Sequence, residues 1–448
     1  MKAFLILEDG TVYQGTHIGA DRDAVSEIVF NTSMAGYPEV LTDPSYAGQA
    51  VCMTYPLIGN YGICRDDMES VRPWLDGLIV RELSRVASNF RSDCTIQDFL
   101  KEYDIPGIAG IDTRALTIRL REHGTMNGLI TTDENYKIDE VISKLKAYTT
   151  GKVVEKVTCR EKYVVKGSET LADNGPVSGS AIFDPEAYAD GRREMRPSLV
   201  RELNGIVGGT SCSAGSCDNA GSSTTGSDKA GSCTTGSSTA GSSMAGSSTA
   251  GNGMSDGRHL QVALMDFGLK KNIIRQLAMR GCDVTVYPAA TTASEIIASS
   301  PDGIMLSNGP GDPKECVSEI KEIKKLYDTD IPIFAICLGH QLMALATGAD
   351  THKLKYGHRG GNHPVKDLET GRVYISSQNH GYVVDTDNLD PKIAVPAFVN
   401  VNDGTNEGLT YTGKNIFTVQ FHPEACPGPQ DSGYLFDRFI ERMERAHA

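Results

Sequence analysis

The second half of the chain alternates short apolar runs with amphipathic segments, and this alternation limits the fold more than any other feature. After about residue 258 the sequence predicts strands at "LQVALMDFG", "DVTVYP", "DGIMLSNGPGDP" (ending in a Gly/Pro loop) and "IPIFAI". Helices are predicted between them at "KKNIIRQLAMRG", "TASEIIASS" and "KECVSEIKEIKKLYD". Because continuous apolar strands that alternate with helices are typical of parallel sheets covered on both faces, we expect an α/β fold with an open, mostly parallel sheet.

The first half gives a less regular pattern. Short strand-like runs mix with turn residues, and helical spacing appears at "TIQDFLKEYD" and "TRALTIRLREHG", the second ending at Gly124. At 448 residues the chain is also too long for one ordinary core. We therefore expect a smaller mixed α/β domain at 1–160 and a separate α/β domain at 258–448.

Residues 161–257 are expected to connect the two domains. Within them, 208–257 consist almost wholly of Gly, Ser, Thr and Ala, with Ala-Gly pairs recurring about every ten residues. Such a segment buries too little apolar surface to offset its ordering entropy. We expect it to be a disordered linker, and its sequence does not indicate a role.

Charge and cysteine usage exclude several classes of partner. The formal net charge of −14 argues against nucleic acid or an anionic membrane as the main partner. No run approaches the roughly 18 apolar residues of a membrane span, and the N-terminal apolar run is too short for a signal peptide. The 11 cysteines are odd in number and lack zinc-site spacing, which predicts free thiols in the cytoplasm and no metal site.

Cys337 lies where the predicted strand "IPIFAI" turns into a helix. A nucleophile at such a turn stands clear of the sheet, and the helix N-terminus stabilises a thiolate. The tight turn requires small neighbours, here Ala335 and Gly339. A buried structural cysteine is the alternative, and this stretch alone does not decide between them.

A cysteine nucleophile also needs a base and a group that orients the base. The stretch "FTVQFHPEA" provides both, because His422 and Glu424 are two residues apart and alternate residues of an extended segment point to the same side. An oxyanion formed on a carbonyl would need N–H donors, for which Leu338 and the glycines of "SNGPGDP" are candidates. That loop lacks both common nucleotide-binding motifs.

In this order, "NGPGDP", "CLGHQ" and "HPEA" resemble the class I (triad) glutamine amidotransferases. The chain as a whole is similar to the small, glutamine-hydrolysing subunits of carbamoyl-phosphate synthetases. "FNTSMAGYPEVLTDPSY" and "GIDTRALTIRLREHGTMNG" match the N-terminal domain of that family, and "YGHRGGNHPVKD" and "SQNHGYVVD" match its C-terminal half. The insert at 208–257 stands where the family has a much shorter connection.

The resemblance implies a role for each matching residue. Cys337 would be the nucleophile, His422 the general base and acid, and Glu424 its orienting carboxylate. The backbone of Gly309 and Leu338 would form the oxyanion hole. The residues implied to hold L-glutamine are Ser45, Gly311, Gln341, Asn379, Gly381 and Tyr382. Because Ser45 belongs to the N-terminal domain, the pocket would lie against the domain interface.

The same resemblance implies a large-subunit partner that carries ATP and Mg²⁺ and makes carbamoyl phosphate, for pyrimidine and arginine biosynthesis. No cofactor is expected in this chain. Ala335 departs from the family, which usually has Gly there. Three alternatives stay open: a subunit of another synthase, a free-standing glutamine or γ-glutamyl hydrolase, and a non-catalytic regulatory subunit.

Four further histidines have less specific interpretations. We expect His340 and His380, which lie near the site by motif, to be structural. His358 and His363 in "GHRGGNHP" hint at metal ligation, but no third ligand follows at a suitable spacing. A hydrogen-bonded loop is therefore the favoured interpretation of that stretch.

Overall fold

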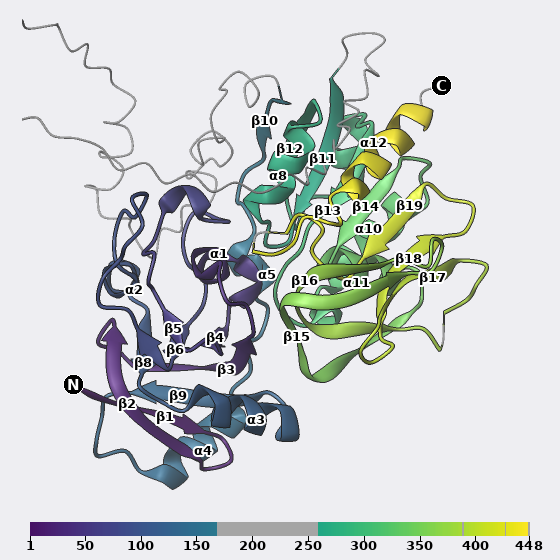
Figure 1. Cartoon of the computed structure of the whole chain (residues 1–448). Helices are drawn as coiled ribbons and strands as arrows, with labels where there is room; N and C mark the ends of the chain where they lie inside the picture. Colours follow the sequence, from purple (N-terminus) through teal and green to yellow (C-terminus); the bar gives the residue numbers. More distant parts are fainter. Residues whose placement is uncertain (168–258, 388, 426, 447–448) are drawn as a thin grey trace, which may run out of the picture. The chain divides into compact units, whose positions relative to one another are not determined.

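Two large β-sheet structures organise the chain in the computed structural model, one in each half (Figure 1). The structure describes residues 1–167, 259–387, 389–425 and 427–446. The described residues of both halves belong to one compact unit by their contacts. The stretch 208–257 and the disorder expected for it lie outside the described residues.

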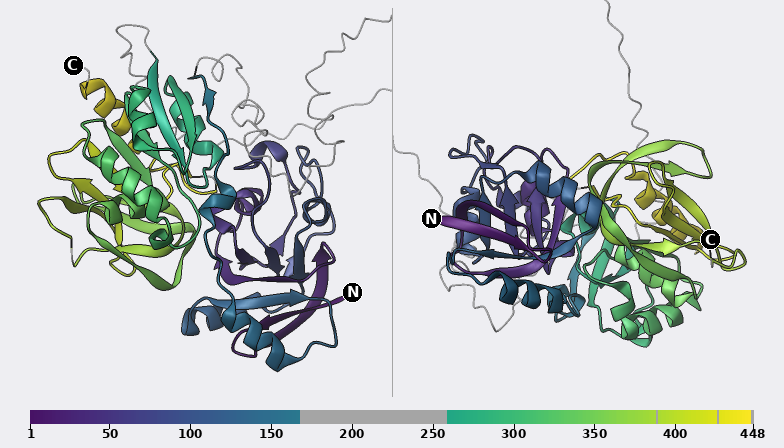
Figure 2. Two further views of the ribbon diagram at one scale, coloured as in Figure 1. Left: turned by 180° about the vertical axis from the view of Figure 1, so that it is seen from behind. Right: turned by 90° about the horizontal axis from the view of Figure 1, so that it is seen from below.

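The N-terminal half is a closed barrel with the strand order β1-β2-β8-β6-β4-β3-β9, which Figure 2 shows in two further views. Closure pairs every strand on both sides, so the barrel has no free sheet edge. Its strands are β1 (Lys2–Leu7), β2 (Val12–Gly19), β3 (Ala24–Asn31), β4 (Gln49–Met53), β6 (Gly77–Val80), β8 (Pro106–Ala109) and β9 (Met126–Thr131). A separate pair is formed by β5 (Leu57–Ile58) and β7 (Glu82–Leu83).

Helices pack on the barrel and lie in the connections between its strands. They are α1 (Tyr37–Thr42), α2 (Ile96–Glu102), α3 (Thr113–His123), α4 (Ile138–Ala147) and the short α5 (Val154–Val157). The two helices predicted from sequence, α2 and α3, are confirmed. The Thr95 side chain caps α2 by accepting a hydrogen bond from the Asp98 N–H, and α3 ends at Gly124, where φ is 100°.

The C-terminal half contains a sheet with the order β10-β12-β11-β13-β14-β19-β18-β17-β15-β16. The five strands from β12 to β19 run parallel, as the alternation predicts. They are β12 (Cys282–Pro288), β11 (Leu260–Asp266), β13 (Gly303–Leu306), β14 (Ile333–Ile336) and β19 (Ile416–Val419). Their carboxyl ends meet at one edge of the sheet, where ligand sites of such folds form.

Helices pack on both faces of the parallel strands, as predicted. The side chains of α8 (Lys271–Ala278) and α12 (Tyr434–Ala446) enter one apolar core, and those of α9 (Ala293–Ala298), α10 (Val317–Tyr327) and α11 (Leu338–Ala346) enter the other. In the first core Phe334 and Phe417 stack with ring centroids 4.4 Å apart. Burying each such ring contributes about 1.5–3 kcal/mol to stability.

Antiparallel strands extend the parallel sheet on both sides. β10 (Tyr163–Val165) pairs with β12, so the chain has already joined the C-terminal sheet before the undescribed segment. On the other side lie β18 (Asn406–Tyr411), β17 (Ala394–Asn400), β15 (Asp350–Asp367) and β16 (Val373–Asp385). The sequence did not predict β15 to β18 as strands, because their polar and apolar residues do not alternate cleanly.

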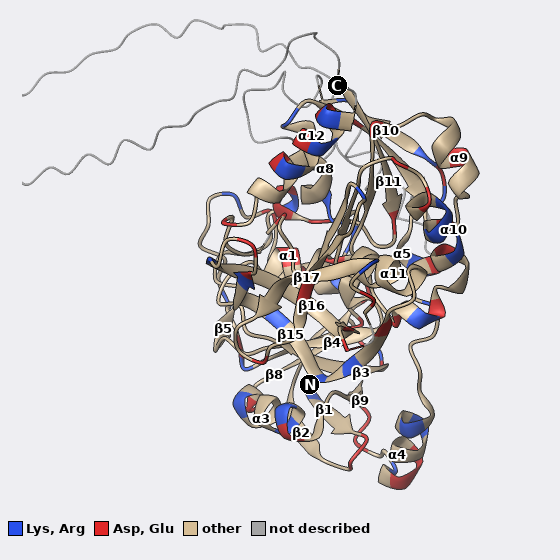
Figure 3. Cartoon of the chain, turned by 90° about the vertical axis from the view of Figure 1, so that its right-hand side faces the viewer, with Lys and Arg blue, Asp and Glu red and all other residues tan. Residues whose placement is uncertain are grey.

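Several outer helices carry charged side chains of both signs. Figure 3 shows both signs mixed along α3, α4, α10 and α12. Their apolar faces are the ones buried against the barrel and the sheet. Among the described helices, none has the length and hydrophobicity needed to cross a membrane.

Candidate active site

Cys337 occupies a strained turn between β14 and α11. Its φ of 52° is a conformation that residues other than glycine rarely adopt, and only 2% of the residue is exposed. The turn is tied to the sheet by the Cys337 N–H, which donates to the Val419 carbonyl at 2.8 Å. Backbone strain of this kind persists at functional turns, where the surrounding structure holds it.

Gly339 allows this turn to lie against the sheet. A Cβ at this position would stand 2.6 Å from the Leu306 carbonyl oxygen and 2.7 Å from the Leu306 Cβ. The small residue required by the sequence argument is therefore needed on the helix side. Ala335 lies on the strand side, fully buried in β14, and pairs with Leu306 and Thr418.

His422 and Glu424 form a buried pair after β19. His422 Nδ1 and Glu424 Oε1 are 2.7 Å apart, and both side chains are 0% exposed. The sequence argument expected an extended segment here, but the chain makes a turn in which the Ala425 N–H donates to the His422 carbonyl at 3.1 Å, and this turn brings the two side chains together. Since a carboxylate only accepts, Nδ1 is the protonated nitrogen and Nε2 is left for the reaction. Among the described residues, His422 Nε2 has no hydrogen-bond partner.

The two side chains shift each other's proton affinity. Burial and Lys270 lower the pKa of His422, but Glu424 and Cys337 outweigh them and raise it to about 9. Burial raises the pKa of Glu424, while Lys270 and His422 hold it down at about 2. The carboxylate therefore stays charged, and the imidazole is able to hold a proton at neutral pH.

Lys270 is a member of this site that the motifs did not reveal. Its Nζ lies 2.6 Å from Glu424 Oε1, with the lysine side chain only 2% exposed. Burial lowers the pKa of Lys270, and the carboxylates of Glu424, Asp43 and Glu69 raise it above the ordinary lysine value. Lys270 follows the carboxyl end of β11, which lies at the ligand-binding edge of the sheet. This position was the signal from which the sequence could have placed Lys270 in the site.

Two polar groups lie beside the Cys337 sulfur. The Asn379 carbonyl oxygen, on β16, is 3.8 Å from Sγ, and Gln420 Nε2 is 3.6 Å from it. Gln420 also accepts from Gln341 Nε2 at 2.9 Å. Sequence reasoning missed Gln420, although it lies in the same stretch as His422 and two residues before it.

The residues implied to hold glutamine come from three parts of the chain. Gln341, on α11, donates to the Tyr382 carbonyl at 2.8 Å. Ser45, in the 3-10 turn Pro44–Tyr46, accepts from Asn308 Nδ2 at 3.0 Å. Asn379 donates to Asp43 Oδ2 at 2.9 Å. Hydrogen bonds between the N- and C-terminal halves therefore meet at this site.

The glycine-rich loop after β13 approaches the rest of the site closely. A Cβ on Gly309 would stand 2.2 Å from the Phe267 carbonyl oxygen and 2.8 Å from the side chain of Leu338. Gly311 has a φ of 95°. The structure thus brings Gly309 and Leu338 together, and Gly381 lies on β16 between Asn379 and Tyr382.

A small pocket lies next to the candidate base. Residues of both halves line it, including Asp43, Lys270, Asn379 and His422. A second small hollow lies over Gly311 and Asp312. His422 of the buried dyad thus borders a pocket that residues of the N-terminal half also line.

Comparison with protein families gives two matches. Residues 263–442 match the family described as "Glutamine amidotransferase class-I", and residues 5–130 match "Carbamoyl-phosphate synthase small chain, CPSase domain". Among solved structures, a putative GMP synthase protein from Thermoplasma acidophilum is 24% identical, covering 42% of this chain and 96% of its own, with a TM-score of 0.38.

Two curated relatives match almost the whole chain. The carbamoyl phosphate synthase small chain of Fusobacterium nucleatum is 43% identical over 98% of this chain and 98% of its own. That of Staphylococcus saprophyticus is 42% identical over 99% of this chain and 96% of its own. With both of its halves matched by that family, the chain belongs to the carbamoyl phosphate synthase small chains, the glutamine amidotransferase subunits of that enzyme.

Proposed function

We propose that this chain hydrolyses L-glutamine through a thioester on Cys337 and passes the ammonia to a large subunit. The observation that carries the proposal is the His422–Glu424 pair at 2.7 Å, placed beside a cysteine held at positive φ on a strand-to-helix turn. Such a constellation suits acyl transfer, which needs a nucleophile, a base and a group that orients the base.

In the first half of the reaction, His422 Nε2 takes the proton of the Cys337 thiol, and the sulfur attacks the γ-carboxamide carbon of glutamine. The backbone N–H groups of Gly309 and Leu338 hold the oxyanion of the tetrahedral intermediate. His422 then donates the proton from Nε2 to the leaving nitrogen, so ammonia departs and a γ-glutamyl thioester remains. Glu424 stabilises the imidazolium throughout this step.

In the second half, His422 acts as a base. It removes a proton from a water molecule that attacks the thioester carbon, and the collapse of the second tetrahedral intermediate releases glutamate and restores the Cys337 thiol. Gln341, Asn379 and Tyr382 hold the substrate in the orientation for attack, and Ser45 completes the pocket from the N-terminal half.

The ammonia then enters a reaction on a separate subunit. In this proposal the large subunit carries ATP and Mg²⁺ and makes carbamoyl phosphate from bicarbonate, for pyrimidine and arginine biosynthesis. The cysteines of the described residues are free thiols, which supports placing the protein in the reducing cytoplasm.

The test uses the complex with its large subunit, supplied with bicarbonate, ATP and either glutamine or ammonia. Cys337→Ser should abolish carbamoyl phosphate synthesis from glutamine and spare synthesis from ammonia. Cys316→Ser is the matched control, because Cys316 is another buried thiol of the same half and lies outside the dyad. If Cys337→Ser still uses glutamine, the nucleophile has been assigned wrongly.

Glutamate release by the chain alone separates the remaining functions. Weak release that rises sharply with the large subunit, ATP and bicarbonate supports a coupled amidotransferase. Strong release that is indifferent to the partner would indicate a free hydrolase. No release in either mixture would indicate a regulatory subunit.

A further inference from the structure

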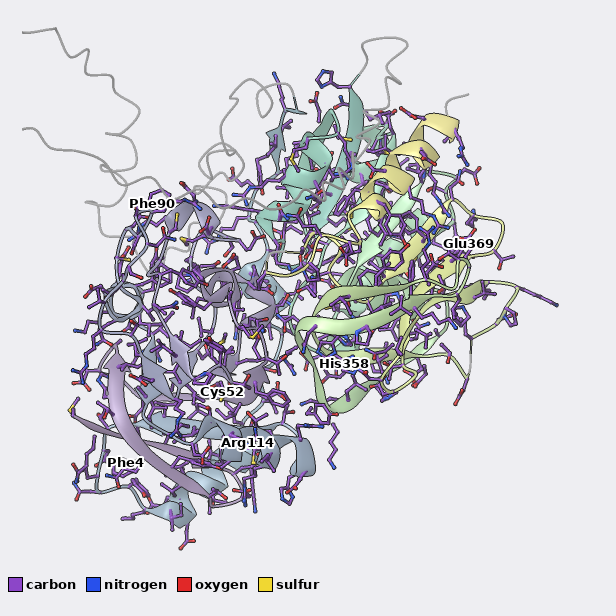
Figure 4. All side chains as sticks on the ribbon, viewed as in Figure 1. Phe4, Cys52, Phe90, Arg114, His358 and Glu369 are labelled. Atoms are coloured by element: carbon purple, nitrogen blue, oxygen red, sulfur yellow. The ribbon has the colours of Figure 1, made fainter. Side chains whose placement is uncertain are left out.

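Three side chains with metal-binding atoms meet in the antiparallel part of the C-terminal sheet. His358 on β15 is paired directly with His380 on β16, and Glu407 comes from β18. Figure 4 labels His358 within this sheet. All three are buried, with exposures of 6%, 5% and 0%. Their ligand atoms lie within 4.8 Å of one another.

The hydrogen bonds around the cluster determine which imidazole nitrogens face it. His358 Nε2 lies 2.8 Å from Asp403 Oδ2, and His380 Nδ1 lies 2.8 Å from the Tyr382 carbonyl oxygen. Since carboxylates and carbonyls only accept, each of these nitrogens carries its ring's proton. In the neutral rings, His358 Nδ1 and His380 Nε2 are therefore lone-pair donors.

Glu407 is fixed in the same way. Its Oε1 accepts from Asn400 Nδ2 at 2.8 Å, and its Oε2 accepts from Gln378 Nε2 at 2.8 Å. These amides orient the carboxylate, and His358 Nδ1 lies 3.6 Å from Oε1, within ion-pair distance when the imidazole is protonated. Second-sphere partners of this kind, a carboxylate or carbonyl behind each histidine, are typical of metal sites.

Two imidazole nitrogens of the cluster are left unpaired by the described residues. Within the part of the chain that the structure describes, His358 Nδ1 and His380 Nε2 have no hydrogen-bond partner. Leaving buried polar atoms unpaired costs about 1–3 kcal/mol each.

A proton and a metal ion would satisfy the cluster differently. A proton on His358 Nδ1 forms one hydrogen bond, to Glu407 or to His380, and leaves the other acceptor alone. A metal ion bonds all three at once. The distance of 3.6 Å between His358 Nδ1 and Glu407 Oε1 is close to the roughly 3.3 Å edge of a tetrahedron with bonds of about 2.0–2.1 Å. The three ligand atoms lie within 4.8 Å of one another, so the widest pair needs to close by up to about 1.5 Å.

From this arrangement we propose that His358 Nδ1, His380 Nε2 and Glu407 bind one divalent transition-metal ion. Two imidazoles and one carboxylate are a known donor set for zinc, with a fourth position open to water. Asp403 and the Tyr382 carbonyl are the second-sphere partners. The sequence analysis considered His358 together with His363 and expected no metal, because no third ligand followed at a suitable spacing. In the proposed site His380 takes the place of His363, and the third ligand comes from β18, whose position in the sheet the spacing does not reveal.

The bound ion has a structural role. His380 directly follows Asn379, whose carbonyl oxygen is 3.8 Å from Cys337 Sγ. An ion that ties β16 to β15 and β18 fixes this stretch beside the thiol. The statement that the ion supports the catalytic thiol rests on the proposed function. The metal site itself does not, because the metal-binding test does not measure glutamine hydrolysis.

The experiment measures zinc and cobalt binding to the full-length chain. In the Cys337→Ser background, which removes the candidate active-site thiol, we expect about one Zn²⁺ per chain by elemental analysis. Co²⁺ in its place should give visible absorption bands of nitrogen and oxygen ligation without the near-ultraviolet band of a thiolate bond. Thiolate bands, or no bound metal, would overturn the proposal.

Variants locate the ion. Glu407→Gln removes a ligand and should weaken Zn²⁺ binding by at least tenfold. Because Glu407 is fully buried, its replacement also risks misfolding, and a second variant is needed. Asp403→Asn is the second test, since Asp403 is 40% exposed in its side chain, and its Oδ2 meets the cluster through His358 while its Oδ1 accepts from Thr405. It should weaken binding about 10–100-fold.

Two histidine variants are the matched controls. His363→Asn alters the neighbouring ring, whose centroid is 5.3 Å from that of His358, and His352→Asn alters an exposed histidine on the same strand, paired with Asp385. Both should bind Zn²⁺ with unchanged affinity. Equal affinity in Asp403→Asn, Glu407→Gln and these controls would place the ion elsewhere and refute the site.

Discussion

Lys270 and His422 share one oxygen of Glu424. Lys270 Nζ lies 2.6 Å from Glu424 Oε1, and His422 Nδ1 lies 2.7 Å from the same atom. All three side chains are buried, so solvent screens their charges weakly. The lysine therefore limits how strongly the carboxylate raises the pKa of the imidazole.

Replacing Lys270 by Met should change both stability and the pH profile. Removing one partner of a buried ion pair costs about 3–5 kcal/mol, which denaturant unfolding measures. The positive charge of Lys270 lowers the pKa of His422, so the basic limb of kcat/KM for glutamine, expected near pH 9, should move to higher pH.

An exposed ion pair is the control for this prediction. Lys324→Met breaks the pair with Asp328, whose side chains are 47% and 62% exposed, and should cost less than about 1 kcal/mol without moving the limb. A basic limb that stays in place in Lys270→Met would show that the lysine has only a structural role.

Glu39→Gln should stabilise the protein in a pH-dependent way. Burial, followed by the charges of Glu69 and Asp67, raises the pKa of Glu39 from 4.5 to about 7. The folded state then binds the proton more tightly than the unfolded state, so this residue's contribution to stability falls as pH rises from 4.5 to 7. The neutral glutamine should gain about 1–2 kcal/mol at pH 8 and almost nothing at pH 4.5.

Urea unfolding of Glu39→Gln at the two pH values checks this difference. Glu140→Gln is the control, because Glu140 is 72% exposed beside Lys137 and should show no such dependence. A gain of the same size at both pH values would mean that the effect does not come from ionisation.

The sequence predicted those parts whose determinants are local. Strands such as β14 are continuous apolar runs, and helices such as α3 carry their own caps and stops, so both were correct. The proximity of His422 to Glu424 followed from a two-residue spacing. Each of these features depends on neighbours in the chain.

Features that depend on distant residues were not predictable in the same way. The closed N-terminal barrel requires β1 to pair with β9, and nothing in the sequence of either strand indicates the other as its partner. Lys270 meets Glu424, and His380 meets Glu407, only through the strand order of the sheet. The roles of Cys337 and of the glutamine-binding residues remain predictions from motif and geometry.

Asp43→Asn should weaken glutamine binding more than turnover. Asp43 Oδ2 accepts from Asn379 Nδ2 at 2.9 Å, and Asp43 Oδ1 accepts from the Ser45 N–H at 2.9 Å. Hydrogen bonds to a charged group contribute about 1.5–3 kcal/mol, so their loss should raise KM for glutamine about tenfold or more.

Steady-state glutaminase kinetics of the complex measure this effect. Asp67→Asn is the control, because it breaks only the partly exposed pair with Arg91 and should leave KM unchanged. If Asp43→Asn lowers kcat and leaves KM at its original value, Asp43 acts on the chemical step and not on the position of Asn379 and Ser45.

Adding a methyl group to the helix side of the elbow should impair catalysis, and removing one from the strand side should not. In Gly339→Ala the new Cβ meets Leu306 at 2.6–2.7 Å, so α11 shifts away from the sheet and takes Cys337 with it. We expect a loss of about 1–3 kcal/mol in stability and, for a shift near 1 Å, about 100-fold in kcat. Ala335→Gly should cost about 0.5–1 kcal/mol through strand entropy and keep kcat.

Unfolding curves and glutaminase rates of both variants test the contrast. Comparable losses of kcat would mean that the Ala335 methyl, where the family usually has Gly, is itself part of the support of the nucleophile.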